Sequence, residues 1–335
     1  MFYRMYPDGN LNTMNLSIII PVYNEVETLP ILSQALLDTF NPLSLEWEVV
    51  YVDDGSADGS LSCLESLSKA DPEHTCVVAL RRNFGQTAAI AAGIDHAKGD
   101  VIVLMDADMQ NDPADIPAML EKIEEGYDVV SGWRKNRQDT FLTRTLPSRI
   151  ANWLISTVTG VYLHDYGCTL KAYRREALTG FRLYGEMHRF IPAYAHSVGA
   201  RMIELPVNHH PRKFGKTKYG LNRTIKVILD LFTVKFLISY ASKPIYLFGG
   251  TGAIFMLMSL GLLSFLFIRK LLFSTSVLQS TFFQIGIMLM ILGVQSVLMG
   301  LIAELLVRTY HESQQKPTYT VRKVLNGEHK TIRQN

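Results

Sequence analysis

Two long uncharged runs near the C-terminus limit what this chain can fold into more than any other feature. About 24 residues, from Ile245 to Ile268, pass without a charged side chain, which is enough to cross the hydrocarbon core of a bilayer. A second uncharged run extends from Leu271 to Ala303 and is most apolar from Phe282 onward. Water-soluble helices of this length carry charges on one face. The sequence therefore predicts two transmembrane helices, 245–268 and 282–307, rather than two buried core helices.

Basic residues beside the two runs predict the orientation of this membrane segment. Arg269 and Lys270 are expected in the short connection between the runs. More basic residues lie on the side of the chain ends: Lys235, Lys243, Arg308, Lys316, Arg322 and Lys323. The positive-inside rule then assigns both termini to the cytosol. The N-terminal stretch MFYRMYPDGN has no apolar segment of the signal-peptide type, which agrees with that orientation.

The part of the chain before the membrane alternates short apolar runs with helical patterns. Five runs are rich in Val and Ile and apolar on both faces, as parallel strands covered by helices are: 16–23, 46–54, 75–80, 100–108 and 127–132. Helical patterns separate them at 25–39, 58–70, 86–97 and 113–124. The alternation predicts an α/β fold, a doubly wound and mostly parallel sheet with helices on both faces.

An acidic cluster follows the fourth predicted strand, within LMDADMQNDP. Carboxylates about 4 Å apart repel by ~4 kcal/mol in a protein-like dielectric, so such a cluster needs a cation or protons. Asp106 and Asp108 are two residues apart on the predicted strand, so their side chains point the same way and can face one ligand. Oxygen ligands suit Mg²⁺ or Mn²⁺, and Gln110 would add a carbonyl oxygen. Asp112, which precedes a proline, fits the N-cap of the next helix instead.

Asp53 and Asp54 follow the second predicted strand on the same rim. Their carboxylates can accept hydrogen bonds from a nucleobase or from ribose hydroxyls. The sequence DDGS also makes a good loop, but the neighbouring metal site favours nucleoside binding. No GxGxxG follows the first strand and no GxxxxGK[ST] occurs, so dinucleotide and P-loop sites lack support. The net charge of +2 gives no support for a nucleic-acid partner.

Residues 221–243 are predicted to form an amphipathic helix on the membrane surface. Apolar residues recur at helical spacing beside basic ones, and the segment directly precedes a membrane run. An ordinary surface helix packed on the sheet is the alternative. In the second run Gly286, Gly293 and Gly300 lie seven residues apart, so another helix can approach that face closely. That helix would be the first run or, in a homo-oligomer, a neighbouring subunit.

The chain carries an ordered set of short motifs: PVYNE, DDGS, RNFGQ, DADMQ, NRQD, DYGC and FGKTKY, followed by the two membrane runs. This set resembles family 2 glycosyltransferases of the polyprenyl-phosphate type. Undecaprenyl-phosphate aminoarabinose transferases and bactoprenol glucosyltransferases are most similar, and dolichyl-phosphate mannose synthases are more distant. The resemblance implies a GT-A fold, a nucleotide-sugar donor, Mg²⁺ or Mn²⁺, and transfer of one sugar with inversion to undecaprenyl or another polyprenyl phosphate. It also implies a multi-pass protein of the cell (inner) membrane with its catalytic domain in the cytosol.

The resemblance also implies roles for individual residues of this sequence. Catalytic roles fall to Asp108, Arg134 and Asp165, the last as a base or an orienting group. The implied donor contacts are Pro21, Tyr23, Glu25, Asp53, Asp54, Arg81, Asp106, Asp108 and Gln110, and the implied metal ligands are Asp106, Asp108 and Gln110. The implied acceptor-phosphate contacts are Arg134, Arg137, Arg212 and Lys218. A phosphate monoester is mostly dianionic at neutral pH, so it needs positioning by arginines more than it needs a base.

Taken together, these predictions divide the chain into four parts: a cytosolic GT-A domain (1–220), the interface helix (221–243), the membrane hairpin (244–308) and a cytosolic tail (309–335). A dolichyl-phosphate-type mannosyltransferase that uses GDP-mannose is the alternative to a UDP-sugar enzyme. A processive polysaccharide synthase would carry QxxRW and more spans. A nucleotidyltransferase would carry a Gly-rich basic loop where PVYNE stands. A catalytically silent membrane scaffold would have lost the rim acids, which are intact here.

Overall fold

The computed structural model describes residues 15–135, 152, 155–157, 159–179, 187–211, 245–273, 280–313 and 319–327. The chain divides into two compact units, Met1–Leu231 with Pro317–Asn335, and Phe232–Lys316. The predicted interface helix and the predicted phosphate contacts Arg137, Arg212 and Lys218 lie outside the described residues.

Within the described residues, the first unit is built on an eight-stranded mixed sheet of order β7-β5-β6-β4-β1-β2-β3-β8. The strands are β1 (Asn15–Val22), β2 (Glu46–Asp53), β3 (Thr75–Leu80), β4 (Val101–Leu104), β5 (Val129–Trp133), β6 (Lys171–Arg174), β7 (Met202–Pro206) and β8 (Val321–Leu325). The strands β1 to β4 are parallel, with Ile18 opposite both Val49 and Val103. The strand β6 runs antiparallel between β4 and β5, and β8 runs antiparallel to β3. The predicted α/β fold with a mostly parallel sheet is confirmed.

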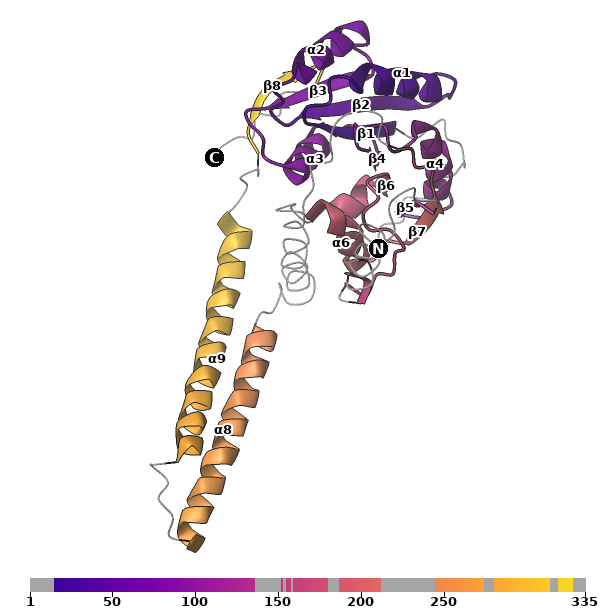
Figure 1. Ribbon diagram of the computed structural model, residues 1–335. Helices are drawn as coiled ribbons and strands as arrows, with labels where there is room; N and C mark the ends of the chain where they lie inside the picture. The colour runs from indigo at the N-terminus through magenta and orange to yellow at the C-terminus, as the bar shows by residue number, and fades with distance from the viewer. Residues whose placement is uncertain are drawn as a thin grey trace. The chain divides into compact units, whose positions relative to one another are not determined.

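Helices cover both faces of this sheet (Figure 1). Ile18 and its neighbours on one face pack in a core with Phe40 and the other apolar residues of α1. On the opposite face a Cβ added at Gly93 of α3 would lie 2.3 Å from Ile19 Cγ2 and 3.3 Å from Val52 Cγ2. Successive residues of a strand thus serve opposite faces, which is why these strands are apolar throughout. The helices are α1 (Leu29–Phe40), α2 (Ser60–Ala70), α3 (Gln86–His96), α4 (Ile116–Glu124) and α6 (Ile191–Ser197).

The strand β4 ends earlier than its apolar run predicts. The last residue of β4 is Leu104, which lies opposite Ile19 of β1 and Lys171 of β6. The chain then leaves the sheet in a loop where Met109 has a φ of 59°. The prediction that Asp106 and Asp108 point the same way because both are on a strand is therefore wrong. Hydrogen bonds of the loop set the positions of these carboxylates instead.

The described C-terminal residues complete the sheet after the two long helices. Val324 of β8 lies opposite Val78 of β3, and the backbone N–H of Arg81 donates to the carbonyl of Thr320 at 3.0 Å. The buried Tyr319 hydroxyl donates to Asp95 Oδ2 of α3 at 2.7 Å. A segment assigned from the sequence to a tail therefore forms an edge strand of the sheet.

The second unit contains two long apolar helices, α8 (Ile245–Phe273) and α9 (Thr281–Ser313) (Figure 1). Both are long and apolar enough to cross a membrane. Only 17% of the most apolar stretch of each helix is buried, whereas a core helix of a soluble protein would be mostly buried. Arg269 and Lys270 lie in the last turns of α8, which corrects their predicted place in the connection.

Small residues bring α8 and α9 into close contact. A Cβ added at Gly293 would lie 2.6 Å from Met256 Cγ and 2.9 Å from the carbonyl oxygen of Gly252. The hydroxyl of Ser259 donates to the carbonyl of Gly286 at 2.6 Å. Gly286 and Gly293 therefore face the first run of the same chain, and their spacing gives no separate support for a contact between subunits.

We expect Gly293→Val to loosen this helix pair. The added methyl groups would overlap Gly252 and Met256, and overpacking of this kind costs about 1–3 kcal/mol. The melting temperature of the full chain in detergent should fall. Gly261→Val is the matched control, because a Cβ there meets nothing within 4 Å. Equal melting temperatures for the two variants would contradict this packing.

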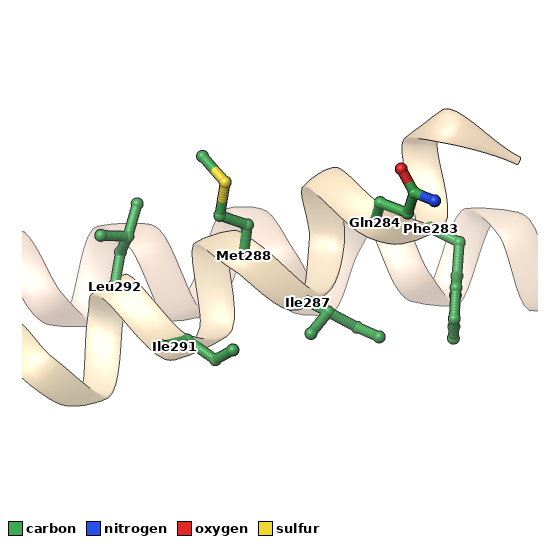
Figure 2. Close-up of a pocket in the computed structure, with 6 residues that line it drawn as sticks. All are labelled: Phe283, Gln284, Ile287, Met288, Ile291 and Leu292. Carbon is green, nitrogen blue, oxygen red and sulfur yellow. The ribbon is translucent and has the colours of Figure 1, made fainter.

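A shallow groove on α9 has an apolar lining and one amide. Figure 2 shows its lining side chains in two rows with helical spacing: Phe283, Ile287 and Ile291, and Gln284, Met288 and Leu292. Side chains four residues apart lie on the same side of a helix. A surface of this composition suits contact with lipid chains, which are as apolar as leucine.

Candidate active site

The loops that follow β1, β2 and β3 are tied together at the carboxyl ends of these strands. The Asn24 backbone N–H donates to Ser56 Oγ at 2.9 Å, and Asn24 Oδ1 accepts from the Ala57 N–H at 2.8 Å. Gly55 has a φ of 71°, and a Cβ there would lie 2.6 Å from the carbonyl carbon of Arg82. Only glycine fits this position, so the sequence DDGS forms a close junction between neighbouring rim loops.

Asp53 and Asp54, the predicted nucleoside contacts, are both buried at the end of β2. The two oxygens of Asp54 accept from the backbone N–H groups of Phe84 and Gly85, at 2.7 and 2.9 Å. Asp53 Oδ1 accepts from the Ser56 N–H at 3.3 Å. Burial raises the pKa of both carboxyls, and these hydrogen bonds oppose the rise. Asp54 therefore holds the residues that lead into α3, and nucleoside contact stays a prediction for both.

The other predicted donor contacts lie at the same edge of the sheet. Pro21 is near the end of β1, and Tyr23 follows it with 38% of its surface exposed. The Glu25 carbonyl accepts the first hydrogen bonds of α1. Arg81 follows β3, and its backbone pairs with the residue before β8. The structure brings these four residues to one rim, and their contact with a nucleotide stays a prediction.

The Asp106 carboxylate is held from two sides. Gln86 Nε2, at the first residue of α3, donates to Asp106 Oδ1 at 2.8 Å. Thr169 Oγ1 donates to Asp106 Oδ2 at 2.9 Å, and Asn111 Nδ2 donates to Thr169 Oγ1 at 3.0 Å. The sequence did not identify Gln86, Asn111 or Thr169 as site residues. Their positions beside the motifs were the available signal: Gln86 is the last residue of RNFGQ, Asn111 directly follows DADMQ, and Thr169 directly follows DYGC.

The rest of the acidic loop is also fixed by hydrogen bonds. Asp108 is 7% exposed, and its Oδ1 accepts from the Gln110 N–H at 3.1 Å. The Gln110 carbonyl accepts from the His210 N–H at 2.9 Å. Asp112 Oδ1 accepts from the Ala114 N–H at 3.0 Å, so Asp112 is the predicted N-cap, although of the 3-10 turn Pro113–Asp115 that leads into α4. Asp112 therefore has a structural role separate from those proposed for Asp106 and Asp108.

The oxygen atoms of this loop fit a small divalent cation. Asp106, Asp108 and Gln110 offer carboxylate and amide oxygens, which Mg²⁺ and Mn²⁺ prefer. In the part of the chain that is described, no group of three or more His, Cys, Asp or Glu side chains is arranged to hold a metal. Mg²⁺ commonly takes only one or two carboxylates and completes its shell with water and substrate phosphates. The residues present therefore suit a metal that binds together with a diphosphate.

Arg134 and Asp165 form a two-point ion pair. Arg134 follows β5, and its Nε and Nη2 donate to Asp165 Oδ2 and Oδ1 at 2.7 and 2.9 Å. The side chains are 13% and 3% exposed. A Cβ added at Gly167 would lie 3.1 Å from Arg134 Nη2, so a larger residue there would shift the guanidinium by a few tenths of an ångström. This parallel geometry fixes the guanidinium plane and favours an orienting role for Asp165.

Buried groups hold the turn that contains Asp165. Lys171, at the start of β6, is 3% exposed and donates from Nζ to the carbonyls of Tyr166 and Cys168. Burial lowers the pKa of Lys171, and the two carbonyls replace part of the solvation that its ammonium loses. Glu204 Oε1 of β7 accepts from the Asp165 N–H at 3.3 Å. Because Thr169 is in the same turn, the turn contacts Arg134 at one end and Asp106 at the other.

Comparison with known proteins identifies the family. Residues 17–181 match the model of glycosyl transferase family 2. The chain is 39% identical to the dodecaprenyl-phosphate galacturonate synthase of Rhizobium johnstonii over 321 residues, which cover 95% of each protein. It is 37% identical to the undecaprenyl-phosphate 4-deoxy-4-formamido-L-arabinose transferase of Enterobacter sp. (strain 638), over 96% of this chain and 97% of that one.

A solved structure supports the same fold. The glucosyl-3-phosphoglycerate synthase of Mycobacterium tuberculosis, crystallised with Mn²⁺, uridine diphosphate and phosphoglyceric acid, superposes with a TM-score of 0.50. The match covers 67% of this chain and 79% of that one at 19% identity, so it is a likeness of fold. The identity to the relatives over nearly the whole chain is decisive: this protein belongs to glycosyl transferase family 2 and is a glycosyltransferase.

Proposed function

We propose that this protein transfers a single sugar from a nucleotide-sugar donor, a UDP-sugar in the first instance, to undecaprenyl or another polyprenyl phosphate. The observation that carries the proposal is the turn 165–169, which pairs with Arg134 at one end and with Asp106 at the other. The Arg134 guanidinium suits a phosphate group, and the Asp106 carboxylate suits a metal–diphosphate site. The names of the two relatives support a polyprenyl-phosphate acceptor.

A divalent metal is part of this proposal, with Asp106, Asp108 and Gln110 as its protein ligands. When bound, Mg²⁺ or Mn²⁺ would stabilise negative charge on the nucleoside diphosphate. Support comes from the oxygen ligands of the loop and from a protein of the same fold that was crystallised with Mn²⁺ and uridine diphosphate. Asp53, Asp54, Pro21, Tyr23, Glu25 and Arg81 would line the donor side.

The acceptor side would rely on positioning rather than on a base. An acceptor phosphate oxygen is already a nucleophile near neutral pH. It would form a bond to the anomeric carbon as the bond from that carbon to the diphosphate oxygen breaks, on the opposite face, which inverts the configuration. Arg134 would hold the acceptor phosphate, and Asp165 would fix the plane of the guanidinium. Arg137, Arg212 and Lys218 are proposed as further phosphate contacts.

The membrane arrangement belongs to the same proposal. If α8 and α9 both cross the bilayer, the chain returns to the side from which it started. The pairing of β8 with β3 supports this, because residues before and after the hairpin share one sheet. We place that sheet and both termini in the cytosol, at the inner membrane. The domain limits 1–220, 221–243, 244–308 and 309–335 remain proposals, with the strand β8 of the last segment belonging to the sheet of the first.

Sugar transfer in detergent tests this function. The full chain would be incubated with undecaprenyl phosphate, labelled UDP- or GDP-sugars, and Mg²⁺ or Mn²⁺. We expect one UDP-sugar to give a chloroform-soluble labelled product that disappears with EDTA. A product from GDP-mannose alone would favour the mannosyltransferase alternative. Nucleotide binding without transfer from any donor would favour the silent scaffold.

A further inference from the structure

A directional hydrogen-bond relay ends on the Asp106 carboxylate. Asn111 Nδ2 donates to Thr169 Oγ1 at 3.0 Å, and Thr169 Oγ1 donates to Asp106 Oδ2 at 2.9 Å. A hydroxyl has a single proton, whereas an ionised carboxylate can only accept. With the Asn111 amide directed at its oxygen, Thr169 is left to donate its proton toward Asp106.

The surroundings of Asn111 agree with this direction, which the acceptor-only carboxylate of Asp106 sets. Asn111 is 4% exposed, and its backbone forms an antiparallel bridge with His209. Its Oδ1 lies 4.0 Å from Cys168 Sγ, and the same sulfur lies 3.9 Å from the carbonyl oxygen of Leu170. The thiol is a weak donor and Oδ1 is an acceptor, so both ends of the amide face groups of suitable polarity.

The second oxygen of Asp106 is held independently of the relay. Gln86 Nε2 donates to Oδ1 at 2.8 Å from the first turn of α3. Just beyond it, the buried Thr87 hydroxyl and His188 Nδ1 are 2.7 Å apart, which ties this turn to residues 187–190. Two neutral donors from different parts of the fold therefore hold the Asp106 carboxylate, one on each oxygen.

We propose that Thr169 is a positioning residue of the donor site, which fixes the orientation of the Asp106 carboxylate through the relay from Asn111 and thereby sets the affinity for the metal. This inference rests on the proposed metal site at Asp106 and Asp108. Groups that orient a ligand side chain typically change metal affinity by about 10- to 100-fold when they are removed. Thr169→Val keeps the shape of the side chain and removes the hydroxyl.

Binding of Mn²⁺ alone and with uridine diphosphate is the test, measured on the full chain in detergent by the electron paramagnetic resonance signal of free Mn²⁺. We expect Thr169→Val to weaken Mn²⁺ binding by about 10- to 100-fold, and Thr169→Ser, which retains the hydroxyl, to restore most of it.

The same substitution elsewhere controls for a general loss of stability. Thr39→Val removes a hydroxyl that donates to the Ala35 carbonyl within α1, and it should leave Mn²⁺ binding unchanged. Wild-type affinity in folded Thr169→Val would overturn the positioning role while leaving the metal site intact. Weak binding by both Thr169→Val and Thr169→Ser, with lowered melting temperatures, would show a structural role instead. No Mn²⁺ binding by the wild-type chain would overturn the proposed metal site and this inference with it.

Discussion

Asp108→Asn is expected to lower sugar transfer by about 10²–10³-fold, the effect typical of removing one preorganised electrostatic group from an active site. Asparagine keeps the shape of the side chain and can still accept the hydrogen bond from the Gln110 N–H, which is 3.1 Å from Asp108 Oδ1. It removes the negative charge that the proposed metal needs. The measurement is kcat/KM for the labelled donor at saturating Mg²⁺ or Mn²⁺, together with Mn²⁺ binding.

Asp112→Asn is the matched control within the same motif. Asp112 accepts from the Ala114 N–H and from His210 Nε2, so its carboxylate serves the loop and the following turn. We expect a small loss of stability, about 1 kcal/mol for a weakened N-cap, and unchanged transfer. If Asp108→Asn transfers sugar as well as Asp112→Asn does, the metal and diphosphate role of Asp108 is wrong.

Arg134→Lys is expected to lower kcat/KM for polyprenyl phosphate by about 10- to 100-fold, since a hydrogen bond to a charged group contributes about 1.5–3 kcal/mol. Lysine keeps the charge but cannot form the two parallel bonds that now fix the guanidinium against Asp165. The loss should appear mainly in KM for the acceptor, with KM for the donor little changed. Arg174→Lys is the control. Arg174 is at the opposite end of β6 from Lys171, 3.7 Å from Asp128 Oδ1, and should not affect transfer.

Asp165→Asn separates an orienting group from a base. If Asp165 only holds Arg134, its loss should affect the same acceptor KM, and the double variant with Arg134→Lys should be little worse than either single one. The shape of the pH–rate profile should then stay as in the wild type. A profile that loses its acidic limb only in Asp165→Asn would instead assign Asp165 to proton transfer.

Local patterns in the sequence were sufficient for part of this fold. The continuous apolar runs of β1, β2 and β3 and the uncharged length of α8 and α9 are properties of neighbouring residues. The strands β6, β7 and β8 were missed because they are short and carry charged residues, such as Lys171 in β6. Their strand conformation depends on partners elsewhere in the chain, and β8 gains its partner only after the two membrane helices.

The acidic loop shows the same limit within the site. The sequence placed Asp106, Asp108 and Gln110 at the end of a strand, and that location is correct. Alternation along a strand does not align the two carboxylates, because β4 ends at Leu104 and the loop has its own hydrogen bonds. Alternation along a strand applies only while the strand is paired with its neighbours.

The sequence by itself determined the motifs, their order, the alternation of strands and helices, and the two apolar spans. Each of these features depends only on residues that are close together in the sequence. Only the tertiary structure decided which side chains meet. Arg134 reaches Asp165 across 31 residues, Thr169 reaches Asp106 across 63, and Tyr319 reaches Asp95 across 224. Such contacts follow from the pairing of strands distant in sequence, here β4 with β6 and β3 with β8, and no local pattern encodes that pairing.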